Sequence, residues 1–147
     1  MTNYFPASDN GIVGTSRIPN RKRPAGKRTV LVVENHEEVR DIVGSMVADQ
    51  GWHPLKAATV SEALTCLDRE IVDAIVSDWE LDDGDGDQIL KKAASGKIRI
   101  PTVMISSYAS PELIAQARAA GAVDMLAKPF RVEELTDLLT RELSASD

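Results

Sequence analysis

The sequence predicts an α/β fold in which five parallel strands form one doubly wound sheet with helices on both faces. Two observations carry this prediction. From Val30 onward, short apolar runs alternate with segments whose apolar residues recur at the helical period. Five such strand-then-helix units follow one another, which is typical of a parallel sheet covered by helices. With 147 residues and 43% apolar composition, the chain is long enough to bury the core of one domain.

The expected strands cover residues 30–33, 53–58, 73–77, 101–105 and 123–127. The second strand should lie at the edge of the sheet, because Pro54 cannot donate a hydrogen bond to a neighbour. The first helix is predicted by apolar residues at i, i+3, i+4, i+7 and i+8 from Val39, and Gly51 ends it. The second begins at a capping box formed by Thr59 and Glu62 and should run to about residue 70.

The third helix should begin near Asp85 and end by Gly96. The fourth is indicated by Ser110, a typical N-cap, followed by a proline at the first helical position and an acid in the first turn. The last helix, 133–143, repeats leucine at the helical period. Right-handed crossovers place such helices on both faces, and five units suit the flavodoxin-like (βα)5 strand order 2-1-3-4-5.

Charge divides the chain into two parts. Residues 1–28 hold six basic residues and one acidic residue, and 17–28 are rich in Pro and Gly, so we expect a flexible basic arm. The arm is interpreted as a solubilising linker, while contact with nucleic acid, a membrane or the acidic body stays open. Residues 29–147, with 11 basic and 22 acidic residues, form the expected domain. We expect no membrane span and a cytoplasmic location, since long apolar runs and a secretory signal are missing. Cys66 should be buried, because it lies at an apolar-periodic position beside Leu64 and Leu67.

Polar residues follow four of the five expected strands. They are Glu34, Asn35, Asp78, Ser106, Ser107 and Lys128. In this architecture ligands bind outside the carboxyl ends of the strands. The carboxylates of Glu34 and Asp78 could hold Mg²⁺, and a carboxylate surrounded by a metal, a hydroxyl and a lysine makes a phosphoryl site. Asp78 would be its nucleophile, because a carboxylate can form an acyl phosphate. His36 is interpreted as a solvated loop residue, with a ligand or proton-carrying role left open.

Six segments of the chain occur in the order and at the spacings of one known family. They are 30–35, Val76-Ser-Asp78-Trp, Asp85-Gly86, 101–106, Ala119-Ala-Gly-Ala122 and Lys128-Pro-Phe130. On these segments, residues 30–144 resemble the receiver domain of two-component response regulators. The resemblance implies that Asp78 accepts a phosphoryl group from a histidine kinase or a phosphotransfer protein. Lys128 would bind the acyl phosphate, and the Lys-Pro bond after it is usually cis in this family.

The resemblance also implies a metal site and a route for the signal. The implied Mg²⁺ ligands are Glu34, Asn35, Asp78 and the backbone carbonyl of Glu80. Ser106 matches the switch hydroxyl that moves onto the phosphoryl group, because it lies five residues after Pro101, although a slip to Ser107 stays open. The signal would pass to a downstream protein, or act by self-association, through the face of the fourth helix, fifth strand and fifth helix. We expect no nucleic-acid-binding domain in this chain.

Two positions depart from the family pattern. The family normally has two acids after the first strand, whereas this chain has Glu34 and Asn35, so we expect weaker Mg²⁺ binding. Asn35-His-Glu-Glu38 also resembles a capping box for the first helix, which does not exclude a metal contact. Met125 stands where many members carry a rotating aromatic residue coupled to the switch hydroxyl. Tyr108 is the nearest aromatic that could act similarly.

Three functions compete. The first is a signalling switch that catalyses only its own phosphorylation and dephosphorylation and is not an enzyme on an external substrate. The alternative is a pseudo-receiver, an interaction scaffold that Mg²⁺-dependent phosphorylation does not switch. The two departures favour it, and the retained acceptor, hydroxyl and lysine oppose it. The third, an acyl-phosphate hydrolase, needs a hydroxyl residue after the acid at position 80, where the chain has Leu81.

Six carboxylates lie between residues 78 and 87. A calcium loop read from Asp83 fails, because Gln88 and Ala94 replace its turn glycine and its bidentate acid. Residues 82–87 are therefore interpreted mostly as a solvated turn, with acids near the N-terminus of the third helix.

Overall fold

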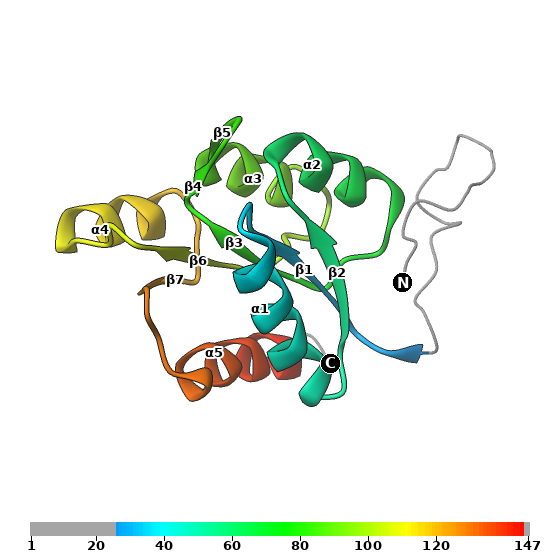
Figure 1. Cartoon of the computed structure of the whole chain (residues 1–147). Coiled ribbons are helices and arrows are strands. Elements are labelled where there is room, and N and C mark those ends of the chain that lie inside the picture. The colour runs from blue at the N-terminus through cyan, green and yellow to red at the C-terminus, as the bar shows by residue number, and fades with distance from the viewer. Residues whose placement is uncertain (1–25, 146–147) are drawn as a thin grey trace.

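The computed structural model describes residues 26–145. Five parallel strands form one sheet in the order β2-β1-β3-β6-β7 (Figure 1). They are β1 (Thr29–Val33), β2 (His53–Ala57), β3 (Ala74–Asp78), β6 (Thr102–Ser106) and β7 (Asp124–Ala127). The numbers β4 and β5 belong to two short strands that pair outside this sheet. The predicted flavodoxin-like order 2-1-3-4-5 is therefore confirmed, with the proline-containing strand at an edge.

The segment between β3 and the third helix holds more structure than the expected solvated turn. Here β4 (Glu80–Leu81) pairs antiparallel with β5 (Gly84–Asp85), with Glu80 opposite Asp85. Two-residue strands are too short to show a period in the sequence. This small hairpin begins two residues after Asp78, so it fixes the backbone beside the end of β3.

Five helices connect the strands. They are α1 (Glu37–Asp49), α2 (Val60–Arg69), α3 (Gly86–Ala93), α4 (Pro111–Ala119) and α5 (Val132–Ala145). The N-caps predicted for α2 and α4 are confirmed. Thr59 Oγ1 accepts a hydrogen bond from Glu62 N at 3.0 Å, and Ser110 Oγ accepts one from the first turn of α4. Gly51, with a φ of +89°, follows the C-cap of α1 as predicted. Asp85, near which α3 was expected to begin, is its N-cap.

The capping box predicted at the start of α1 is wrong. The N-cap residue is His36, and its side chain makes no capping hydrogen bond. The Asn35 amide instead donates to Asp82 Oδ1 at 3.1 Å, and the His36 backbone N–H donates to the Glu34 carboxylate at 3.0 Å. The tertiary contact of Asn35 with Asp82 and the local contact of His36 with Glu34 thus replace the predicted capping box.

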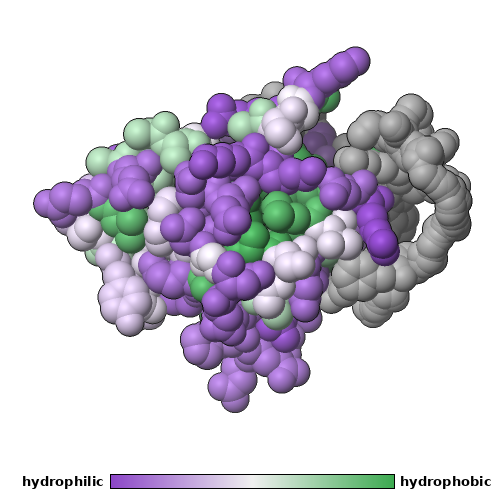
Figure 2. All heavy atoms as spheres, turned by 90° about the horizontal axis from the view of Figure 1, so that it is seen from above, coloured by the Kyte–Doolittle hydropathy of each residue, from purple (hydrophilic) through white to green (hydrophobic). Residues whose placement is uncertain are grey.

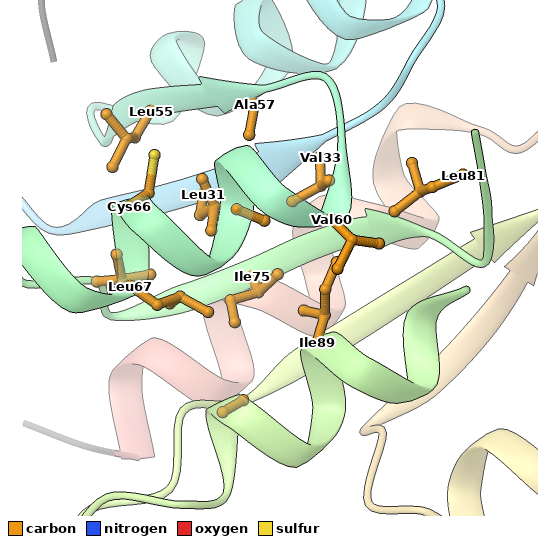
Figure 3. Packing of buried hydrophobic residues seen from close by; sticks show 13 residues of the cluster. Leu31, Val33, Leu55, Ala57, Val60, Cys66, Leu67, Ile75, Leu81 and Ile89 are labelled. Atoms are coloured by element: carbon orange, nitrogen blue, oxygen red, sulfur yellow. The ribbon is translucent and has the colours of Figure 1, made fainter. Parts of the chain in front are cut away.

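Apolar side chains alternate between the two faces of the sheet and build the core. Leu31 and Ile75 point to the face that α2 and α3 cover, where Cys66 is buried as predicted (Figure 3). Val30 and Val32 point to the other face, under α1 and α5. Each fully buried aliphatic side chain contributes roughly 1.5–3 kcal/mol, so the packing of both helical layers on the sheet stabilises the fold.

The outer surface of the α2–α3 layer is mostly hydrophilic, with a smaller apolar area among the polar side chains (Figure 2). Within residues 26–145, none of the helices has the length and apolar character to cross a bilayer. The basic arm predicted for 1–28 lies outside the described residues, except for 26–28. The division into arm and domain therefore stays a prediction.

Candidate functional site

One ammonium group joins the ends of three strands. Lys128, which follows β7, places Nζ 2.8 Å from Glu34 Oε1 and 2.9 Å from Asp78 Oδ2. Glu34 follows β1, and Asp78 is the last residue of β3. Because β1 and β3 are paired in register, with Val33 opposite Ser77, the two carboxylates lie at the same level of the sheet. The predicted convergence of these three side chains is found in the structure.

The two carboxylates of this site are withdrawn from water. Glu34 is fully buried, and Asp78 is only 4% exposed. A buried carboxylate is tolerated when it is paired and hydrogen-bonded. Lys128 supplies that pairing to both, and the loss of its charge would leave two like charges side by side.

The environment of Glu34 keeps it ionised. Burial opposes its charge, but the hydrogen bonds from Lys128 and His36, with the positive charge of Lys128, outweigh burial. They hold the pKa of Glu34 below its ordinary value. Both carboxylate oxygens are engaged, since Oε1 accepts from Lys128 and Oε2 accepts from the His36 backbone at 3.0 Å.

The environment of Asp78 acts in the opposite direction. Burial, to which the nearby Glu34 charge adds, outweighs the contacts with Lys128 and raises the pKa of Asp78 to about 6. Lys128 itself loses solvation, yet its contacts with Glu34 and Asp78 raise its pKa above the ordinary lysine value. Near neutral pH, Asp78 is therefore a mostly ionised carboxylate that water stabilises poorly.

Ser106, the last residue of β6, is fully buried, and its hydroxyl makes two hydrogen bonds. The O–H group donates to Glu80 Oε2 at 2.6 Å, and its oxygen accepts from the Tyr108 backbone N–H at 2.9 Å. The neighbouring Ser107 instead lines an open hollow of about 260 Å³ above the strand ends. Ser106 thus contacts the site through Glu80, whereas Ser107 faces the hollow directly.

The hollow is lined by oxygen-bearing side chains and by the lysine. They include Asn35, Asp78, Glu80, Asp82, Ser107 and Lys128. Oxygen ligands suit Mg²⁺, which usually keeps several waters. Three of the predicted metal residues, Asp78, Asn35 and Glu80, face the hollow and fit such an ion. Glu34 does not line it and would have to release an existing contact to bind a metal.

No three His, Cys, Asp or Glu side chains within residues 26–145 are grouped to hold a metal among themselves. The weaker Mg²⁺ binding expected from Asn35 stays a prediction.

Several contacts of the acidic segment were not predicted. The carboxylate of Asp83 accepts hydrogen bonds from the backbone N–H groups of Val60 at 2.8 Å and Ser61 at 3.0 Å, so the hairpin caps α2. The Asp82 carboxylate accepts a hydrogen bond from the Asn35 amide, and the Glu80 carboxylate accepts one from the Ser106 hydroxyl. Each partner is more than twenty residues away in the sequence. The only signal in the sequence is the turn-forming composition of the segment, which favours side-chain hydrogen bonds to nearby backbone groups.

Two features expected from the resemblance are also placed by the structure. The Lys128–Pro129 peptide bond is cis. Met125 is buried, with 3% of its surface exposed, in a cluster with Trp79, Met104 and Ala117 beneath α4. His36 keeps its side chain largely exposed, with Nδ1 3.2 Å from Glu34 Oε2, and Tyr108 is exposed at the rim of the hollow.

Comparisons with known proteins agree on one family. The family profile described as response regulator receiver domain matches residues 30–140. A putative response regulator NtrX-like protein of Rickettsia conorii is 33% identical over 114 residues, 76% of this chain and 24% of the relative. Sporulation initiation phosphotransferase F of Bacillus subtilis is 25% identical over 114 residues, 78% of this chain and 92% of the relative. The solved receiver domain of the Francisella response regulator 1452 superposes with a TM-score of 0.76 at 25% identity, covering 82% of this chain and 99% of that one.

Proposed function

Because this chain belongs to the response regulator receiver domain family, we propose that it is a signalling switch whose phosphoryl acceptor is Asp78. One observation carries the proposal. Lys128 Nζ lies 2.9 Å from Asp78 Oδ2, so a cation already stands where the negative charge of a phosphoryl group would develop. The hollow in front of Asp78 leaves room for the incoming donor.

The proposed step is an attack by a carboxylate oxygen of Asp78 on phosphorus. The new P–O bond forms an acyl phosphate, and the bond between phosphorus and the donor atom breaks, with its electron pair leaving on the donor. Lys128 would bind an oxygen of the transferred phosphoryl group and neutralise part of its negative charge. Asn35, Asp78 and the Glu80 carbonyl would hold Mg²⁺, whose role is to neutralise further charge.

The donor, the partners and the route of the signal are part of the same proposal. The chain spans about a quarter, 24%, of the length of the first curated relatives that it matches. A histidine kinase or phosphotransfer protein would supply the phosphoryl group. Ser106 would act as the switch hydroxyl, and the α4–β7–α5 face would contact a downstream protein or a second copy. The cytoplasmic location expected from the sequence stays a prediction.

The competing functions have less support. Receiver domains are generally signalling domains rather than enzymes, which disfavours a hydrolase. The comparisons are with response regulators and give the pseudo-receiver scaffold no support. Retention of the Glu34–Lys128–Asp78 arrangement also argues against it, since two buried carboxylates and a lysine are costly to keep without a task.

Labelling with a small phosphodonor tests the proposal. Wild type, Asp78→Ala and Asp82→Ala are incubated with acetyl phosphate and Mg²⁺, and the mass of the intact protein is measured. We expect one added phosphoryl group on wild type and on Asp82→Ala, and none on Asp78→Ala. Asp82 is the matched control, because it is another carboxylate of the same hollow. Unlabelled wild type would favour the pseudo-receiver, and labelled Asp78→Ala would reject Asp78 as the acceptor.

A further inference from the structure

The side chain of Glu80 has a contact that a backbone metal ligand does not need. Its Oε2 lies 2.6 Å from Ser106 Oγ, 26 positions away along the chain. Glu80 is half-buried and also lines the hollow beside Asp78. One carboxylate therefore reaches from the hairpin strand β4 to the end of β6, next to the proposed phosphoryl acceptor.

The hydroxyl of Ser106 has no spare proton. A serine hydroxyl carries one proton and two acceptor sites. The Tyr108 backbone N–H occupies an acceptor site at 2.9 Å, and the single proton is donated to Glu80. A phosphoryl group offers only acceptor oxygens, so Ser106 can bind it only by donating that same proton. The contact with Glu80 and a contact with a phosphoryl group on Asp78 are mutually exclusive.

We infer that Glu80 is a positioning residue that restrains the Ser106 hydroxyl in the unphosphorylated state and must release it when Asp78 is phosphorylated. This inference rests on the proposed function and adds a specific competitor for the switch hydroxyl. A short hydrogen bond from a hydroxyl to a carboxylate is among the stronger ones in proteins. Breaking it subtracts from the free energy gained when the phosphoryl group binds Ser106, so Glu80 sets how readily this domain switches.

Removal of a carboxylate near Asp78 also reduces repulsion of any incoming anion, and the test must separate the two effects. A double-mutant cycle does so, because coupling through Ser106 is lost when Ser106 is alanine, whereas repulsion is not. The probe is beryllofluoride with Mg²⁺, a mimic of the phosphoryl group. Its binding is followed by the change in tryptophan fluorescence, since Trp79 is adjacent to Asp78 and 6% exposed, and Trp52→Phe is made in every variant to leave Trp79 as the single tryptophan.

In the Ser106 background, we expect Glu80→Ala to bind beryllofluoride about tenfold more tightly, because a hydrogen bond to a charged group no longer has to be broken. In the Ser106→Ala background, the same substitution should tighten beryllofluoride binding by no more than about threefold. Asp82→Ala is the matched control. It removes another carboxylate from the hollow without touching Ser106, so its effect should be equal in both backgrounds. An equal effect of Glu80→Ala in both backgrounds would overturn the inference.

A measurement on the ligand-free protein keeps this test separate from the proposed function. The Tyr108 amide donates to Ser106 Oγ, so its NMR resonance reports the state of the hydroxyl. We expect Glu80→Ala to shift this resonance and Asp82→Ala to leave it in place. An unchanged resonance in Glu80→Ala would show that Glu80 does not restrain Ser106. Failure of wild type to bind beryllofluoride would instead reject both the switch and the proposed competition for it.

Discussion

The ammonium of Lys128 lies 2.8 Å from the fully buried carboxylate of Glu34, and this contact is built from residues 94 positions apart. Glu34 does not line the hollow, whereas Lys128 does. Glu34 therefore contacts Lys128 from the buried side, away from the hollow. It holds the lysine at the end of β7 in position, while Lys128 extends to Asp78 at 2.9 Å. This order of contacts makes the lysine a structural element as well as a proposed phosphoryl ligand.

Substitution of Lys128 by methionine should destabilise the protein. Glu34 and Asp78 would then be two buried carboxylates without a counter-charge, which costs on the order of 3 kcal/mol in the free energy of unfolding. Part of the lost stability should be regained at low pH, where protonation of Glu34 or Asp78 removes the repulsion between them. Urea denaturation at neutral and mildly acidic pH measures both effects.

The control for Lys128 is Lys56→Met, which also removes one ammonium from an ion pair. Lys56 Nζ lies 3.1 Å from Asp41 Oδ1 at an exposed position, so its loss should cost no more than about 1 kcal/mol. Equal destabilisation by the two substitutions would contradict the view that the Lys128 pairs are energetically special because they are buried.

Asp78→Asn should stabilise the metal-free protein at neutral pH. The folded-state pKa of Asp78, about 6, lies above the unfolded value of about 3.9, so the folded state binds more protons between these values. Ionisation of Asp78 therefore lowers stability as pH rises through this window, and asparagine cannot ionise. The two values differ by about 2 pKa units, and at about 1.4 kcal/mol per unit the gain well above pH 6 is on the order of 3 kcal/mol.

The sign of this pH dependence is the check on Asp78. The difference in unfolding free energy between Asp78→Asn and wild type, measured in EDTA, should shrink as pH falls below about 6 and vanish near pH 4. Asp41→Asn controls for the removal of an exposed charge. A wild type more stable than Asp78→Asn at neutral pH would mean that the contact with Lys128 outweighs the cost of burial.

Asp83→Ala should destabilise the start of α2. Asp83 accepts from Val60 N and Ser61 N, and loss of a helix cap of this kind typically costs about 1 kcal/mol. These backbone hydrogen bonds hold the pKa of Asp83 below its ordinary value, so its contribution is present above the unfolded pKa and is lost as pH falls. Thermal unfolding of Asp83→Ala and Asp82→Ala at two pH values measures it. An equal loss in both variants would argue against the cap.

The sequence was sufficient for the sheet order and for the three strand ends that meet at Lys128. Apolar periodicity and helix caps are local sequence signals. The carboxyl ends of parallel strands lie at one edge of the sheet, whatever conformation the connecting loops adopt. The contacts of Glu80, Asp82 and Asp83 could not be predicted in this way. They join a short hairpin to β6, α1 and α2 across long sequence separations, and a turn rich in acids has the same composition whether its carboxylates are solvated or bound.

The same contacts give Asn35 a specific prediction. Its amide donates to Asp82 Oδ1 at 3.1 Å, so Asn35→Asp would replace a hydrogen bond by repulsion and lower stability in EDTA. A carboxylate at position 35 is also a stronger Mg²⁺ ligand, and affinity should rise on the order of tenfold. Because Mg²⁺ would bind only the folded state, stability should recover as the ion is added. Trp79 fluorescence titrations and urea midpoints with and without Mg²⁺ measure both effects. In the double variant Asn35→Asp/Asp82→Ala, the loss of stability in EDTA should disappear, because the repelling carboxylate is gone, while the gain in Mg²⁺ affinity should remain.

Unchanged Mg²⁺ affinity in Asn35→Asp would remove Asn35 from the proposed metal site, since its side chain lines the hollow where the ion would bind.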